Sequence, residues 1–158
     1  MRSQEEQLQM IGLMAAHESA IAQLYTAYAE RFPGSRSLFE GLAADEVGHA
    51  RLIADFSGEV RAGKVHVKPG RFSSQSILTS LDYLRDRLQE ATSADISLLE
   101  ALSTAADIED ALIERRYFEI IEEDAPELER LLRTLACDTE AHRLRARRAW
   151  ENERGGPS

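Results

Sequence analysis

The sequence is poor in the residues that build cross-linked or loop-rich proteins. Its 158 residues include 1 cysteine, 4 prolines and 9 glycines, and aromatic residues make up 6% of the chain. The single cysteine, Cys137, excludes a disulfide framework and any zinc or iron–sulfur site built from several cysteines. The scarcity of proline and glycine leaves few helix breaks, and the abundant Leu, Ala, Glu and Arg favour helices.

Positive charge and long apolar runs are also in short supply. Lysine and arginine number 19 against 28 acidic residues, which gives a formal net charge of −9. We therefore expect no nucleic-acid partner, because such binding depends on clustered positive charge. No apolar run approaches the ~20 residues that cross a bilayer, so no membrane partner is expected. The first residues lack the cationic and apolar segments of a secretory signal, and we expect a cytoplasmic protein.

Apolar residues recur at helical spacing along most of the chain, of which 43% is hydrophobic. This pattern predicts a first helical hairpin over about residues 4–61, with a break at Pro33. A second hairpin is predicted over about residues 94–150. Its first helix is expected to end near Glu123, and Pro126 to open its second helix, where the missing N–H of proline is harmless.

The connection between the two hairpins is long. It covers residues 62–93 and is predicted to contain a shorter amphipathic helix of its own. The fold expected from these elements is all-α, an antiparallel four-helix bundle made of two helical hairpins with an extra short helix in the crossover. Residues 1–154 are expected to form one domain, and residues 155–158 a flexible tail.

A short motif occurs twice, once in the second helix of each hairpin. The first copy, residues 42–49, reads Leu-Ala-Ala-Asp-Glu-Val-Gly-His, and the second, residues 135–142, reads Leu-Ala-Cys-Asp-Thr-Glu-Ala-His. Leu, Ala, Asp and His recur at matched places. The first helix of each hairpin also has a glutamate within its apolar stripe, Glu18 in one and Glu109 in the other. The two halves therefore repeat the same construction.

The inward-facing carboxylates require a neutralising charge. An ionised carboxylate on a core-facing stripe is costly unless something positive lies beside it, and no lysine or arginine is patterned near Glu18, Glu46 or Glu109. A divalent metal would supply that charge. Glu46 and His49 are three residues apart on one helix face and can bind one ion together. Two such faces and two inward glutamates make a pair of adjacent metal positions, whose oxygen and imidazole donors favour iron or manganese.

The aspartates of the repeat, Asp45 and Asp138, each lie four residues before a histidine. A carboxylate at that position can accept the second N–H of an imidazole, on its own helix or on the facing one, and so orient the ligand. We expect these two residues to orient the histidines or to serve as alternative ligands.

With these residues the chain resembles the ferritin-like superfamily and, within it, the rubrerythrin-like branch of di-iron carboxylate proteins. That template takes one glutamate from each of two helices and a Glu-x-x-His from each of the other two. The resemblance covers the chain from about Gln4 to Trp150. The metal ligands that it implies are Glu18, Glu46, His49, Glu109 and His142. In the family, the residues at the positions of Glu18 and Glu109 are terminal carboxylate ligands, and the residue at the position of Glu46 is a bridging carboxylate.

Two features depart from the family pattern. Thr139 stands where the family has its other bridging glutamate, and Glu140 is one position later, rotated by ~100° on a helix. Thr139 offers only a hydroxyl, which can hold a metal-bound water, and Glu140 would have to reach round to act as a ligand. The sequence also lacks the paired cysteines of the small rubredoxin-type iron domain of full-length rubrerythrins. Electrons for catalysis would therefore come from a separate donor.

Two further features lie close to the proposed ligands in the sequence. Tyr25, Tyr28 and Tyr117 are interpreted as core residues, and a role as hydrogen-bond partners of a metal site stays open. His17 adjoins Glu18 but lies on a different strip of the helix, and is interpreted as a packing or surface residue.

The resemblance implies a non-haem iron oxidoreductase. Two iron ions per chain are expected, and one iron ion per chain is the alternative. Manganese or zinc is expected as a substitute for iron. The hypothesis is that the site reacts with O2 or hydrogen peroxide, removing peroxide or oxidising ferrous iron, with no catalytic residue apart from the ligands. Pairing into a homodimer is also expected from the family. Two alternatives stay open: a module that binds one metal through Glu18, Glu46 and His49, and a metal-free bundle that acts as an interaction protein because Thr139 replaces a bridging glutamate.

Overall fold

The computed structural model describes residues 3–67, 74–111, 121–123 and 126–155. The α-helices within these residues are α1 (Gln4–Arg31), α2 (Arg36–Arg61), α3 (Ser74–Ser93), α4 (Leu98–Asp110) and α6 (Pro126–Arg154). A short 3-10 helix, Pro33–Ser35, joins α1 to α2, and two short strands are present, β1 (Val65–Val67) and β2 (Ile121–Glu123). None of the helices in the described ranges is long and apolar enough to cross a membrane.

Both hairpins open with the same local signal. In α1 the Ser3 hydroxyl accepts a hydrogen bond from the Glu6 backbone N–H, while the Glu6 carboxylate accepts one from the Ser3 N–H. In α4 the same reciprocal pair joins Ser97 and Glu100. Each capping box satisfies backbone donors that the first helical turn leaves without partners. The helix starts of the two halves are therefore alike, as the repeated construction predicts.

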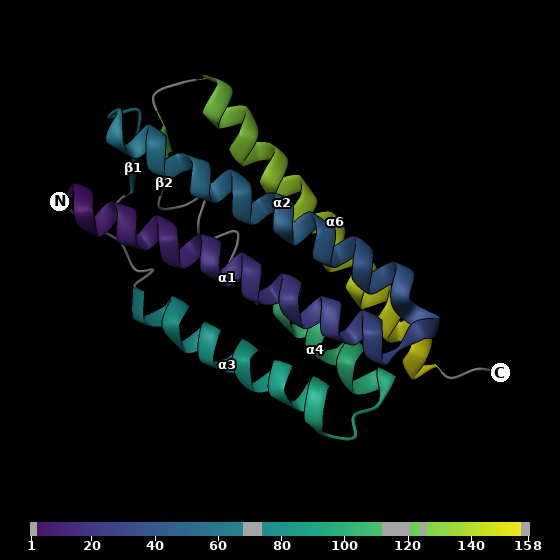
Figure 1. Ribbon diagram of the computed structural model, residues 1–158. Coiled ribbons are helices and arrows are strands. Elements are labelled where there is room, and N and C mark those ends of the chain that lie inside the picture. Colours follow the sequence, from purple (N-terminus) through teal and green to yellow (C-terminus); the bar gives the residue numbers. More distant parts are fainter. Residues whose placement is uncertain (1–2, 68–73, 112–120, 124–125, 156–158) are drawn as a thin grey trace.

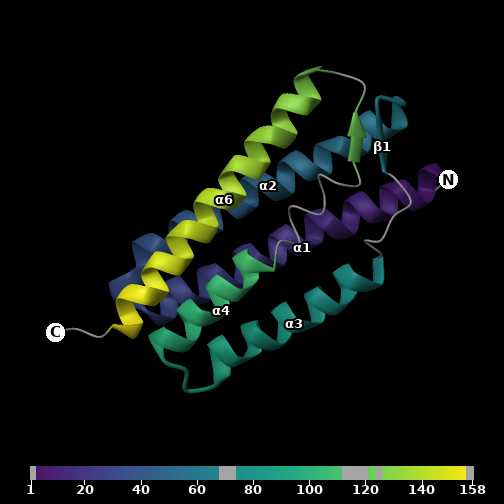
Figure 2. The same ribbon diagram turned by 180° about the vertical axis from the view of Figure 1, so that it is seen from behind.

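The helices form the predicted antiparallel bundle (Figure 1). α1 and α2 run in opposite directions as one hairpin, and α4 and α6 form the other. The hairpins meet through α2 and α6, where Asp45 contacts His142, and through α1 and α4, where Tyr25 contacts Glu109. α3 packs against α1 on the outside of the bundle (Figures 1 and 2). The all-α fold of two hairpins with a helix in the crossover is confirmed.

Two boundaries differ from the expectation. The crossover helix α3 has 20 residues and is longer than α4, which has 13. The helix predicted to reach Glu123 ends at Asp110 instead, and residues 121–123 form β2, which pairs antiparallel with β1. The helix prediction was wrong here because three-residue strands are too short to show an alternating pattern. Residues 112–120, and residues 156–158 of the expected flexible tail, lie outside the described ranges.

The β-ladder closes one end of the bundle. Its register places Val65 opposite Glu123 and Val67 opposite Ile121. Val65 and Val67 are buried in the core, and the Val67 N–H donates to the side-chain oxygen of Gln7 on α1 at 2.9 Å. β-Branched residues suit such a pleated, half-buried surface better than a helix. The ladder therefore ties the crossover to the first turn of α1 and to the second hairpin.

Within the part of the chain that the structure describes, the buried apolar side chains form two separate clusters along the bundle. The cluster near the β-ladder includes Met10, Met14, Ile53, Phe56, Val65 and Leu135. The cluster at the other end includes Ile21, Tyr25, Phe39, Leu42, Leu102 and Ala146. On α1, α2 and α6 the buried residues between these two sets are polar, apart from Ala50 on α2, and buried Glu109 on α4 follows the second set. The apolar stripes of α1, α2 and α6 are thus interrupted by polar residues, and on α4 the described stripe is followed by one.

Candidate metal centre

A polar layer occupies the middle of the bundle. Its members are less than one-tenth exposed and come from all four helices of the two hairpins: Glu18, Glu46, His49, Glu109, Thr139 and His142. The layer lies between two apolar clusters, so that solvent has little access to it. Placing three glutamates there is costly unless positive charge or hydrogen bonds compensate. The structure thus brings every proposed ligand into one interior layer.

Glu46 lies at the centre of this layer. Its Oε1 is 3.2 Å from His142 Nδ1, and its Oε2 is 3.5 Å from His49 Nδ1. The three residues offer ligand atoms that all lie within 4.8 Å of one another, and among the described residues they form a group that can hold a metal ion. The two imidazole rings are stacked, with centroids 5.3 Å apart. One carboxylate therefore faces two imidazoles, one from α2 and one from α6.

The protonation of Glu46 and His142 reflects this contact. Burial would raise the pKa of Glu46, but hydrogen bonds with Glu18, His142 and His49 outweigh it and hold the pKa below its ordinary value. Burial would lower the pKa of His142, but the bond and charge of Glu46, with further negative charge nearby, raise it from 6.5 to about 9. Without metal, the pair is an anion beside a cation at neutral pH. A bound metal would take the place of the proton.

Each imidazole also contacts an aspartate from the opposite helix. His142 Nε2 lies 2.9 Å from Asp45 Oδ2, and His49 Nε2 lies 3.5 Å from Asp138 Oδ2. The aspartates are about half exposed, so they lie at the edge of the layer. Both histidines therefore direct Nδ1 toward Glu46 and Nε2 toward an aspartate. This is the geometry by which a carboxylate fixes the orientation of a metal-binding imidazole.

Glu18 and Glu109 flank the central group from α1 and α4. Glu18 contributes to the lowered pKa of Glu46, and the charge of Glu109 helps to raise the pKa of His142. The Tyr25 hydroxyl donates to Glu109 Oε1 at 2.8 Å. Tyr25 is thus both a core residue and a hydrogen-bond partner of the layer, the role that its helical spacing left open. Tyr117 lies outside the described residues.

Thr139 and Glu140 occupy the part of the layer where the repeat is broken. Thr139 is 1% exposed, and its hydroxyl donates to the Leu135 carbonyl one turn earlier, at 2.9 Å. Glu140 forms a two-pronged contact with Arg143 on its own helix, with a shortest distance of 2.7 Å. Its carboxylate lies outside the group formed by Glu46 and the two histidines. The position that matches Glu46 in the second copy therefore supplies no carboxylate.

His17 has a role that the sequence pattern did not show. It is 2% exposed, and its Nε2 lies 2.7 Å from the Ser80 hydroxyl on α3. Burial lowers its pKa from 6.5 to about 4, and the charge of Glu46 opposes this shift. His17 is therefore a buried packing residue, within electrostatic range of the layer but bonded outward to the crossover helix. Only the position of α3, which depends on tertiary packing, reveals this partner.

Comparison with known proteins gives one match. Residues 13–124, well over half of the chain, match the family model described as Rubrerythrin. The matched range contains Glu18, Glu46, His49 and Glu109, and it ends before α6. Neither the comparison with curated proteins nor the comparison with solved structures finds a match.

Proposed function

The chain belongs to the rubrerythrin family, and from this premise we propose that its polar layer binds iron and uses it to reduce hydrogen peroxide or O2. One observation carries the proposal: Glu46, His49 and His142 bring ligand atoms within 4.8 Å of one another in the buried middle of the bundle. Surplus buried carboxylates beside this group supply the negative charge that a divalent cation would neutralise.

The donor set fits iron. Carboxylate oxygens and imidazole nitrogens suit iron and manganese, with zinc as a substitute. Glu46 presents one oxygen to each imidazole, so it would be a ligand to both ions if two were bound. We propose that Glu18 and His49 complete the binding of one ion, and that Glu109 and His142 complete the binding of the other.

The chain itself supplies placement and a dry environment. When bound, two ferrous ions supply the two electrons that, with two protons, reduce one hydrogen peroxide molecule to two water molecules. Asp45 and Asp138 hold the imidazoles in orientation, and the Tyr25 hydroxyl holds the Glu109 carboxylate. The apolar clusters on either side limit the entry of water. A separate electron donor is needed to complete a cycle, because the 1 cysteine of the sequence cannot build a rubredoxin-type domain.

Anaerobic loading with ferrous iron tests this proposal. We expect the desalted protein to retain iron, measured by elemental analysis, and to consume added hydrogen peroxide in proportion to the iron retained. Loading should also raise the melting temperature, because a ligand that binds only the folded state stabilises it. Two ions per chain with peroxide consumption supports the proposed reaction. Absence of retained iron, and of any thermal shift, contradicts it and favours the metal-free interaction protein.

Thr139 favours one specific alternative. Because its hydroxyl donates to the Leu135 carbonyl, the second copy of the repeat offers one ligand fewer than the first. A module that holds one ion through Glu18, Glu46 and His49, for storage or sensing, would need no second bridging carboxylate. Retention of one ion per chain without peroxide consumption supports this alternative.

Iron binding should weaken as the pH falls. The pKa of His142 is about 9 in the metal-free protein, so a metal must displace a proton at neutral pH. We expect the apparent affinity for ferrous iron to fall about tenfold for each pH unit below that pKa. Anaerobic titrations from roughly pH 6 to pH 8 measure the slope. An affinity that does not change over this range contradicts the assignment of His142 as a ligand.

The same pKa predicts the stability of the metal-free protein. Since the folded-state pKa of His142 is raised from 6.5 to about 9, its contribution to stability is complete below 6.5 and is lost as the pH rises to about 9. Thermal unfolding of the metal-free protein across this interval should show the decline, and a melting temperature that increases over it would contradict the ion pair.

A further inference from the structure

A cavity of about 180 Å³ lies between α1, α3 and α4. Its polar wall is the pair formed by His17 on α1 and Ser80 on α3, whose side-chain atoms are 2.7 Å apart. Its apolar wall includes Leu84 of α3 and Ile108 of α4. The proposed metal ligands do not line this cavity, so it is a separate feature of the bundle.

The cavity and the polar layer share two helices, α1 and α4, which carry the flanking carboxylates Glu18 and Glu109 of the layer. His17 precedes Glu18 on α1, and Ile108 precedes Glu109 on α4. Consecutive residues on a helix point about 100° apart, so the cavity wall and the layer occupy neighbouring strips of both helices. The charge of Glu46 affects the pKa of His17, which places the His17 side chain close to the layer. His17 therefore lies between the cavity and the proposed ligands.

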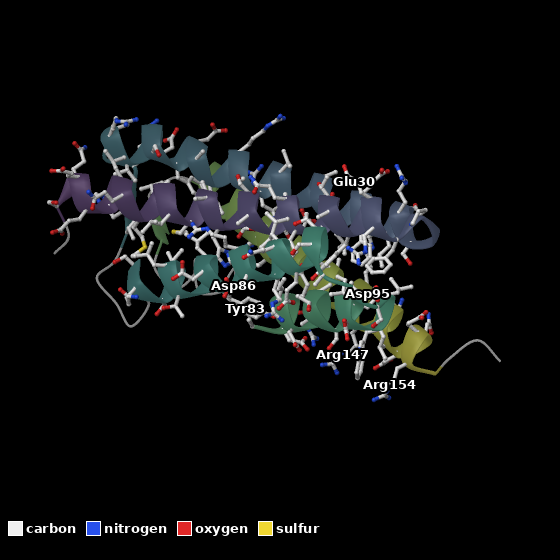
Figure 3. All side chains as sticks on the ribbon, turned by 60° about the horizontal axis from the view of Figure 1, so that its bottom comes forward. Glu30, Tyr83, Asp86, Asp95, Arg147 and Arg154 are labelled. Carbon is white, nitrogen blue, oxygen red and sulfur yellow. The ribbon has the colours of Figure 1, made fainter. Side chains whose placement is uncertain are left out.

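The other side of the cavity leads toward the surface. Tyr83 and Asp107 line the cavity and also line a groove of about 440 Å³ between α3 and α4. Tyr83, labelled on α3 in Figure 3, is 40% exposed, and the Arg87 guanidinium lies 5.3 Å from the centre of its ring. Tyr83 thus stands where the surface groove meets the cavity. The groove and the cavity therefore share part of their lining, and His17 lies on the wall of the cavity next to Glu18 in the sequence.

We propose that this cavity is the binding site for hydrogen peroxide on its path to the metal centre, an inference that rests on the proposed function. A water molecule has a share of about 30 Å³ in the liquid, so the cavity has room for a molecule of a few heavy atoms. The His17 imidazole and the Ser80 hydroxyl are hydrogen-bonded to each other, and the Ser80 oxygen, with one O–H and two lone pairs, keeps capacity for a further hydrogen bond. Hydrogen peroxide, which is neutral and both donates and accepts hydrogen bonds, matches this wall.

The charges around the cavity argue against other small ligands. Asp107 at the entrance and the glutamates of the polar layer disfavour an anion. Among the described residues that line the cavity, Asp107 is the one carboxylate, which is too few for a dehydrated divalent cation. O2 forms no strong hydrogen bond and would gain little from the His17–Ser80 pair. The lining therefore selects for a small neutral polar molecule.

Two variants of neighbouring residues on α3 test the cavity. Ser80→Leu fills it with an apolar side chain, whereas Thr79→Leu adds a leucine at an exposed position of the same helix. With iron loaded, we expect Ser80→Leu to consume peroxide about tenfold more slowly at low peroxide concentration and Thr79→Leu to match the wild type. Iron content and melting temperature are measured for both variants. Wild-type consumption by a folded, iron-loaded Ser80→Leu protein overturns the proposal.

A binding measurement without iron separates this inference from the proposed reaction. In the metal-free protein, titration with hydrogen peroxide should shift the ring nitrogen NMR signals of His17 to a saturating value, and Ser80→Leu should abolish the shift. Ser80→Ala keeps the space and removes the hydroxyl, and should raise KM for peroxide with little change in kcat. Signals of His17 that do not respond overturn the cavity proposal. Failure of the iron-loaded wild type to consume peroxide overturns the proposed function instead.

Discussion

Replacing Glu46 with glutamine is expected to lower the apparent affinity for ferrous iron by about a hundredfold or more. Glu46 is the residue of the polar layer that contacts both imidazoles, and Glu18 contributes to its lowered pKa. Glutamine keeps the size of the side chain but removes its charge and one of its two acceptor oxygens. The substitution therefore affects both proposed ion positions at once. Competition with a chelator of known affinity, under anaerobic conditions, measures the loss.

The matched control for this variant is Glu40→Gln. Glu40 is on the same helix, is exposed, and forms an ion pair with Arg36 at 3.7 Å. The Glu40→Gln substitution removes the same charge at the surface, where an ion pair contributes little to stability. We expect Glu40→Gln to retain wild-type iron affinity. Wild-type iron binding by Glu46→Gln would show that the buried group is not the metal site.

The same variant should weaken the metal-free protein. Without the Glu46 carboxylate, the protonated His142 loses its buried anionic partner and keeps Asp45, which is about half exposed. More of the desolvation cost of the buried imidazolium is then left uncompensated. We expect the free energy of unfolding to fall by about 1–3 kcal/mol. Iron should no longer restore the loss, so the thermal shift on iron addition would disappear while it persists in Glu40→Gln.

The sequence predicted the bundle because the helices carry long apolar stripes. Each stripe spans several turns, and each is interrupted by a polar residue at a comparable place, such as Glu18 in one half and Glu109 in the other. A buried acidic residue in a long apolar stripe is visible in the sequence without any knowledge of the fold. The repeat then places His49 and His142 on the helices that complete the layer. Helical periodicity therefore predicted the bundle helices and the level at which they meet, but neither the end of α4 nor the two strands.

Contacts that depend on helix–helix register could not be predicted. Asp45 and Asp138 were expected to contact a histidine on either helix, and only the packing of α2 against α6 shows that both contacts cross between helices. The partner of His17 is on α3, whose position is set by the crossover and not by any stripe. The pairing of β1 with β2 joins segments far apart in the chain and too short to show a period.

Replacing Thr139 with glutamate adds the carboxylate that the second copy of the repeat lacks. Of the substitutions considered, it is expected to raise iron retention the most, whereas Glu46→Gln lowers it. Thr139 matches Glu46 in the repeat and is 1% exposed, but its hydroxyl is bonded to the Leu135 carbonyl. A glutamate there would give the second ion position the bridging ligand that the family template contains. We expect the variant to retain two ions per chain at free iron concentrations that leave the wild type partly loaded. Iron titration with elemental analysis measures this gain.

Without metal, the same substitution should be destabilising, because it adds a fourth buried glutamate to the layer. We expect the free energy of unfolding to fall by about 2–4 kcal/mol, and saturating iron to recover most of it. Thr134→Glu is the matched control: Thr134 is exposed on the same helix, and its hydroxyl also bonds to the carbonyl one turn earlier, that of Arg130. Thr134→Glu should change neither the amount of iron retained nor the free energy of unfolding. If Thr139→Glu gains no iron and loses no metal-free stability, the side chain at 139 does not enter the layer, and the break in the repeat cannot be what limits the second ion.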